Sequence, residues 1–396
     1  MTLFGKLLTV LLLALIGGAT TLVVKNFQLQ DEPPIQVYSN VLENIRTTEI
    51  ATTTIEVKSD ATPAVSAVEP KKIIDEAPVS AVTAPILLPP PLLVVSTLSR
   101  VESREVEPNW NAINEKTRGA LVNILCTTKN GSVFEPISGS GVFIDQHGLI
   151  LTNAHVAQYL LLTSGDEKSN LLDCTIRVGN PAVNRYRAEL FYISPRWIAN
   201  NAKNILEESP KERGENDYAL LLVTGTTNPN AQLPSSFPFI QLREKLLAAD
   251  TKDAFLAAGY PAGFLGGIAV QRELYSVSSF ATIQSRYTLG EGTLDVIGLG
   301  GNLLAQKGAS GGAIVDWNGE LAGLITTATV EGTTDARDVR ALTIDYIARA
   351  FAEEAGFSLY ELKNAALAPL SLQFNTQIAP LLRKKLTDVI YKTSGN

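Results

Sequence analysis

The alternation of apolar and polar positions divides the chain into four regions. Residues 7–24 form an apolar run without a charged residue, and residues 26–109 show no sustained periodicity. From residue 110 onward, short apolar stretches alternate with Gly, Asn, Asp and Pro, which predicts strands joined by turns. After residue 343, apolar positions recur at helical spacing. The pattern predicts a β-rich body with a helical end, preceded by two segments of a different kind.

The N-terminal apolar run is about as long as the shortest helix that spans a bilayer. It lies between Lys6 and Lys25, and the small residues Gly17 and Ala19 offer only a poor cleavage site. We interpret residues 1–25 as an uncleaved signal anchor, with a cleaved signal peptide as the alternative. The first places the chain at the cell membrane through a single-pass anchor, and the second makes it secreted. Both place the remainder outside the cytoplasm.

Residues 26–109 are rich in Pro, Thr, Ala, Val, Ser and Glu. Because no apolar period is sustained, we expect a Pro-rich, disordered linker. Inside it, the apolar residues 86–95 surround three consecutive prolines. This stretch is either a polyproline spacer or a segment that docks on another surface.

The β-rich region predicts two packed β-barrels, over residues 110–225 and 226–342. Within the first, residues 197–213 indicate an inserted helix and loop. Residues 343–396 then predict C-terminal helices, because residues 343–354 and 377–391 are amphipathic and residues 358–361 form a capping-box pattern. These helices either pack against the barrels or assemble with another copy of the chain into a homo-oligomer.

Composition narrows the function. The 396 residues, 45% of them apolar, suffice for a sizeable core. The net charge of −7 argues against a nucleic-acid partner, which requires a basic face. Two histidines and two cysteines supply no metal-ligand spacing. We therefore expect neither a metal nor another cofactor.

Three polar residues in separate motifs supply what acyl transfer needs. His155 comes just after an apolar strand, Asp217 precedes the apolar stretch 219–223, and Ser310 lies among glycines. They provide a base, a carboxylate that orients it, and a nucleophilic hydroxyl. The only other histidine, His147, lies in a polar turn that contains glycine, so His155 is the candidate base.

Together these motifs resemble the trypsin-like serine peptidases of the chymotrypsin fold, and among them the HtrA type of bacterial envelope protease. The resemblance is carried by residues 138–156, 217–221, 259–263 and 308–324, and it covers roughly residues 121–329. It implies an all-β body of two six-stranded antiparallel Greek-key barrels. A PDZ domain is not expected, because only 66 residues follow Val330.

The family mechanism then assigns roles to matching positions. The resemblance implies that Ser310 is the nucleophile, His155 the general base and Asp217 the residue that fixes the imidazole tautomer. The N–H groups of Gly308 and Ser310 would form the oxyanion hole. Ala309 stands where digestive members carry an Asp that pairs with a newly cut N-terminus, so activation by trimming is not expected.

The resemblance also suggests a substrate pocket and a cysteine pair. The pocket for the P1 residue would be lined by Leu304, Thr326, Thr327 and Ala328, which carry no acid and favour aliphatic over basic side chains. In this fold the strands that carry Cys126 and Cys174 can lie side by side. A disulfide and two buried free thiols both remain open.

The sequence therefore predicts a serine endopeptidase that cleaves extracytoplasmic polypeptides through an acyl-enzyme intermediate. The alternative is a catalytically silent protein of the same fold that binds unfolded chains at the cell envelope. An esterase with a nucleophile elbow is disfavoured, because that fold orders its triad Ser, Asp, His.

Overall fold

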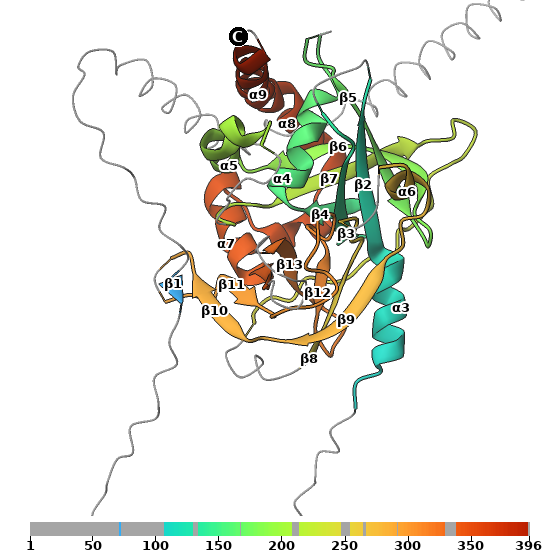
Figure 1. Cartoon of the computed structure of the whole chain (residues 1–396), viewed down its shortest axis with the longest axis vertical. Coiled ribbons are helices and arrows are strands. Elements are labelled where there is room, and N and C mark those ends of the chain that lie inside the picture. Colours follow the sequence, from blue (N-terminus) through green and yellow to red (C-terminus); the bar gives the residue numbers. More distant parts are fainter. Residues whose placement is uncertain are drawn as a thin grey trace, which may run out of the picture.

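The computed structural model describes the β-rich body and the helices that follow it (Figure 1). The described residues are 71–72, 107–129, 134–166, 168–207, 214–246, 254–263, 267–290, 292–328 and 338–394. The predicted anchor and nearly all of the predicted linker lie outside them. Within these described ranges, no helix combines the length and the apolar character needed to cross a membrane.

The first barrel is closed by six antiparallel strands, as the sequence predicted. They are β2 (Leu121–Thr128), β3 (Ile137–Phe143), β4 (Leu149–Thr152), β5 (Leu172–Val178), β6 (Val183–Ile193) and β7 (Ala219–Thr226). Their order is β2-β3-β4-β7-β6-β5, so β5 returns to lie beside β2 in the manner of a Greek key. Strand β4 is buried along its whole length and therefore gives His155, three residues beyond it, a rigid base.

The second sheet departs from the predicted closed six-stranded barrel. It contains β8 (Ala254–Gly259), β9 (Val277–Thr282), β10 (Ser285–Thr288), β11 (Val296–Gly298), β12 (Ala313–Val315), β13 (Leu321–Ala328) and β14 (Val339–Thr343). Its order, β10-β11-β14-β13-β12-β8-β9, leaves the sheet open between β9 and β10.

The opening has a local cause. Only Ile283 and Gln284 separate β9 from β10, so one bent segment pairs with β8 along its first half and with β11 along its second half. Counted as one strand, it gives the sheet the same neighbour order as the first barrel. Strand β1 (Lys71–Lys72), inside the predicted linker, pairs with β10 and extends the sheet.

Three short helical segments accompany the first barrel. Helix α3 (Trp110–Ala120) corrects the expectation of strands from residue 110 onward; the Asn109 side chain caps it by accepting a hydrogen bond from Ala112 N. Helix α4 (Ala154–Ala157) continues into η1 (Gln158–Leu162). Helix α5 (Pro195–Asn201) and η2 (Ala202–Asn204) occupy the start of the predicted insertion.

One further short helix, α6 (Gly267–Arg272), lies between β8 and β9. Figure 1 also shows α3 beside β9, where the rings of Trp110 and Phe280 meet edge to face with their centroids 5.0 Å apart.

The C-terminal region is helical, as predicted, but contains one helix more. Helix α7 (Ile344–Ala355) begins at a Thr343 cap and ends at Gly356 in the left-handed conformation, and η4 (Leu359–Asn364) follows. Helix α8 (Leu367–Gln377) was not predicted and precedes α9 (Ala379–Ser394). Pro369 lies in the first turn of α8, where proline costs no hydrogen bond. Phe374 of α8 is buried on the first barrel, 5.7 Å from the Tyr192 ring.

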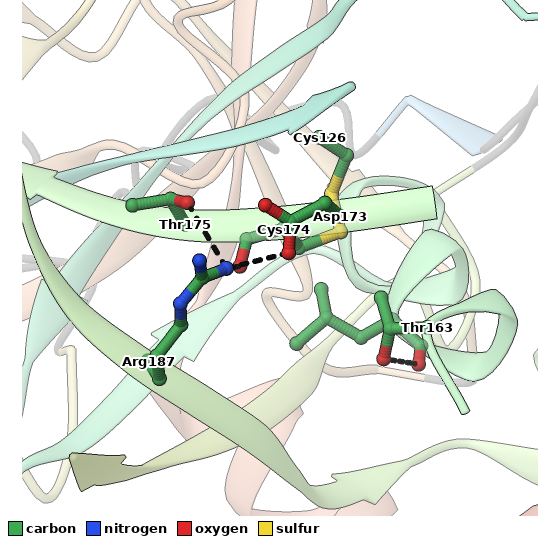
Figure 2. Close-up of a disulfide and its surroundings, with 7 residues drawn as sticks. Cys126, Thr163, Asp173, Cys174, Thr175 and Arg187 are labelled. Carbon is green, nitrogen blue, oxygen red and sulfur yellow. Dashed lines mark hydrogen bonds and ion pairs between the residues drawn. A yellow bond between two sulfur atoms is a disulfide. The ribbon is translucent and has the colours of Figure 1, made fainter. Parts of the chain in front are cut away.

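The two cysteines form a disulfide between neighbouring strands of the first barrel (Figure 2). Cys126 of β2 and Cys174 of β5 are direct cross-strand partners, and their sulfur atoms are 1.99 Å apart. Beside them, the Arg187 guanidinium from β6 donates to Asp173 Oδ1 at 2.5 Å and to the Cys174 carbonyl at 3.1 Å. The disulfide therefore links β2 to β5, the two strands whose pairing closes the barrel.

Replacement of both cysteines by serine should lower the free energy of unfolding. The disulfide spans a sequence separation of 48 residues, for which loss of the cross-link costs about 2–4 kcal/mol. In a denaturant titration, the double-serine variant should unfold at a lower midpoint concentration than the oxidised wild type. The wild type under reductant should unfold at the same midpoint as the variant. Equal midpoints with and without reductant, together with alkylation of both thiols in the native protein, would contradict the disulfide.

Candidate active site

His155 and Asp217 meet where β4 ends and β7 begins. His155 lies on α4, directly after β4, and Asp217 lies directly before Tyr218 and β7. His155 Nδ1 is 2.8 Å from Asp217 Oδ2, and the backbone N–H of His155 donates to Asp217 Oδ1 at 3.0 Å. The fully buried carboxylate therefore holds both the main chain and the ring of His155. This contact fixes the proton on Nδ1 and leaves Nε2 on the opposite side of the ring.

A third donor comes from the second sheet. Thr326 Oγ1, on β13, donates to Asp217 Oδ2 at 2.9 Å. The family resemblance places Thr326 in the substrate pocket, whereas in the structure its hydroxyl donates to the Asp217 carboxylate. Burial raises the pKa of Asp217, but the nearby His155 charge and the hydrogen bonds from His155 and Thr326 outweigh it and leave this pKa below 3.8. Asp217 is therefore ionised at neutral pH.

The loop around Ser310 is fixed through its carbonyl groups. The Lys307 carbonyl accepts from Ala262 N at 2.7 Å, and the Ala309 carbonyl accepts from Gly312 N at 2.9 Å. Because a trans peptide points its N–H away from its C=O, the N–H groups of Gly308 and Ser310 face the other way. Among the described residues neither has an acceptor. Both are therefore available as hydrogen-bond donors.

Gly308 is required at its position for two reasons. Its φ of +93° is a conformation that side chains disfavour, and a Cβ there would lie 2.7 Å from the Tyr260 carbonyl oxygen. Gly311 is more crowded still, since its Cβ would collide with the Ser140 carbonyl oxygen. Glycine at these two positions therefore allows the loop around Ser310 to pack closely against the backbone at Tyr260 and at Ser140.

Backbone contacts bring Ser310 to the His155–Asp217 pair. Ser140 N donates to the Ser310 carbonyl at 2.7 Å, and Gly311 N donates to the Ile325 carbonyl at 2.8 Å, one residue before Thr326. The structure joins His155 to Asp217 directly. It shows no hydrogen bond from Ser310 Oγ to His155, a contact that often tightens only when substrate is bound.

The predicted substrate pocket is less well supported. Leu304 is 1% exposed and packs in the core cluster with Ala305, Ala309 and Ile314, so its side chain is covered. Thr327 and Ala328 end β13, but their side chains lie outside the described residues. The preference for an aliphatic P1 residue stays a prediction. Among the described residues, no group of three His, Cys, Asp or Glu side chains could hold a metal ion.

Helix α7 supports the Asp217 loop from behind, which the sequence analysis missed. Asn216, with φ of +55°, donates its backbone N–H to the Tyr346 hydroxyl at 2.9 Å. On the other flank, Tyr218 Oη donates to Glu354 Oε2 at 3.2 Å. Burial raises the pKa of Glu354, which also accepts from Tyr192 Oη at 2.7 Å. Helical spacing predicts the helix and its apolar face, but it does not predict that Tyr346 and Glu354 are buried or which partners they have.

Comparison with known proteins agrees with this geometry. Residues 139–324 match the family model described as the trypsin-like peptidase domain. This segment of the chain is similar to the trypsin-like peptidase domain. The matched segment contains His155, Asp217 and Ser310, and it supports a trypsin-like serine peptidase. No curated protein matches the chain.

Removal of the Thr326 hydroxyl should impair this peptidase site while leaving its shape intact. In Thr326→Val, kcat/KM should fall roughly ten- to a hundredfold, because a hydrogen bond to a charged group contributes about 1.5–3 kcal/mol. The matched control is Thr117→Val, which removes a buried hydroxyl bonded to Ile113 O on α3. Equal activity of the two variants would contradict the assigned role.

Thr326→Val should also change how the free energy of unfolding depends on pH. A carboxyl whose folded pKa is depressed stabilises the protein above its unfolded pKa, and this contribution is lost as the pH falls through the folded pKa. The difference in unfolding free energy between wild type and Thr326→Val should therefore be constant well above 3.8 and shrink below it. Chemical denaturation at several pH values measures it.

Proposed function

We propose that the protein is a serine endopeptidase that hydrolyses peptide bonds through His155, Asp217 and Ser310. The observation that carries the proposal is the buried Asp217 carboxylate, which holds the His155 ring at 2.8 Å within a matched trypsin-like peptidase domain. The pair of N–H groups without acceptors at Gly308 and Ser310 adds further support.

In the proposed reaction, Ser310 Oγ attacks the carbonyl carbon of the scissile bond as His155 Nε2 takes its proton. The negative charge on the former carbonyl oxygen is stabilised by the N–H groups of Gly308 and Ser310. His155 then protonates the leaving amine, and a water molecule, activated by the same imidazole, releases the acyl group. Asp217 stays ionised throughout and stabilises the positive charge of the imidazolium.

Further parts of the proposal go beyond the matched domain. We place the protein close to HtrA-type envelope proteases, with extracytoplasmic polypeptides as substrates. The alternative, a silent protein that binds unfolded chains, would keep the fold without acylation. The orientation of the Gly308 and Ser310 peptides favours the enzyme, since a binding protein has no need for two unpaired N–H groups beside a serine.

The activity prediction uses purified residues 110–396 with unfolded casein as substrate. Ser310→Ala and His155→Ala should each lose several orders of magnitude in rate, because triad residues act as a unit. A fluorophosphonate should label the wild type and fail to label Ser310→Ala. Binding of casein without cleavage or labelling would favour the silent alternative, and equal cleavage by wild type and both variants would refute the triad.

The location prediction concerns residues 7–24. We propose that they hold the full chain in the membrane with the peptidase domain on the outer face, because the run is long enough to span a bilayer. Carbonate extraction should leave the protein in the membrane fraction, and external protease should reach the domain in spheroplasts. A soluble protein with its N-terminus near Thr20 would instead indicate a cleaved signal peptide.

A further inference from the structure

We propose that Ser140 is a positioning residue for the oxyanion loop, residues 307–311, and that it acts through its side-chain hydroxyl. Ser140 lies on β3 of the first barrel and is fully buried. Its Oγ donates to the Gly308 carbonyl at 2.7 Å and accepts from Tyr260 N at 2.8 Å. The hydroxyl therefore joins the first barrel to two segments of the second sheet.

The main chain of Ser140 reaches the same loop on the other side of the nucleophile. Its N–H donates to the Ser310 carbonyl at 2.7 Å, and its carbonyl accepts from Thr152 Oγ1 at 2.7 Å. Thr152 ends β4, three residues before His155. One residue thus contacts the loop before and after Ser310 as well as the strand that leads to the base.

Among the described residues, the hydroxyl holds a carbonyl group of the loop for which no backbone donor is found. Lys307 C=O is held by Ala262 N and Ala309 C=O by Gly312 N. The peptide between them is held at its carbonyl, on Gly308, by Ser140 Oγ at 2.7 Å. Its N–H, on Ala309, donates to the Gln306 carbonyl in a longer hydrogen bond of 3.3 Å. Rotation of this peptide would change the direction of the Gly308 and Ser310 N–H groups on either side of it, because adjacent peptides share a Cα atom. Ser140 therefore keeps both donors aimed at one point.

A specific kinetic signature follows, and it rests on the proposed peptidase function. The oxyanion forms only after Ser310 attacks, so a misaligned hole weakens the transition state and not the bound substrate. Ser140 has no contact with the His155–Asp217 pair among its hydrogen bonds. Loss of the hydroxyl should lower kcat and leave KM and the pH profile unchanged.

The test uses the full chain and compares Ser140→Ala with the control Ser371→Ala. Ser371, on helix α8 in the C-terminal region, is also fully buried. Its Oγ donates to Glu189 Oε1 at 2.6 Å. In Ser140→Ala, kcat should fall about ten- to a hundredfold, less than the 10²–10³ typical for loss of an oxyanion donor itself. Affinity for a peptide aldehyde, which forms a tetrahedral adduct, should fall by the same factor. Ser371→Ala should match wild type in both.

Several outcomes would overturn the proposal. An unchanged kcat in Ser140→Ala would contradict it. A rise in KM, or a shift of the pH profile, that accounts for the whole loss of activity in this variant would also contradict it. If the alanine variant does not fold, Ser140→Cys keeps the size with a weaker donor and should give an intermediate kcat; wild-type kcat in this variant contradicts the role. Wild-type protein without Ser310-dependent cleavage would refute the peptidase function and this inference together, whereas an active wild type with an unaffected Ser140→Ala refutes this inference alone.

Discussion

Asp217 carries a negative charge into a fully buried position, and the arrangement of the site depends on how that charge is satisfied. An isolated carboxylate in such a place is strongly destabilising unless donors surround it. Its oxygens receive hydrogen bonds from the main chain and ring of His155 and from Thr326. These donors come from the first barrel and from the second sheet. The two sheets must therefore dock correctly before the charge can be buried, which couples formation of the site to formation of the fold.

The oxyanion loop differs from the surroundings of Asp217. Here the N–H groups of Gly308 and Ser310 have no acceptor among the described residues. Orphaned N–H groups in buried backbone are rare in native proteins. Gly308 is buried, yet neither its N–H nor that of Ser310 meets an acceptor in the described part of the chain. The neighbouring carbonyl groups hold this arrangement through Ala262, Gly312 and the second-sheet backbone. Under the proposed function, these donors would bind an oxygen atom of the substrate, and their fixed orientation would stabilise the transition state.

The candidate site residues could be proposed from sequence because each motif is local. His155, Asp217 and Ser310 each lie next to a buried strand or among glycines, and short patterns record such surroundings. The role of Thr326 was not predictable, because its partner lies 109 residues away and only docking of the sheets reveals it. For the same reason, Ser140 stood out only as part of a motif, without a function.

The fold was predictable to a similar extent, and the parts of the prediction that were wrong have local causes. The strand pattern gave the first barrel, since alternation and turn residues are short-range signals. The bend at residues 283–284 divides one strand of the second sheet, and nothing in its composition announces a break in pairing. Helix α3 follows a stretch without periodicity, so its cap at Asn109 was overlooked. Pro369 obscured α8, although proline in a first turn is compatible with a helix.

Helix α7 shows why amphipathic spacing underdetermines function. Tyr346 and Glu354 are eight residues apart, which places both on one face of the helix. Periodicity predicts burial of the apolar residues of α7, but it does not reveal hydrogen bonds to the residues on either side of Asp217. The Tyr346 hydroxyl accepts the N–H of Asn216, whose left-handed backbone would otherwise leave this donor buried and unpaired. Glu354 holds Tyr218 on the other side. The C-terminal region is thus part of the support of Asp217, because the loop that carries the acid obtains its hydrogen-bond partners from α7.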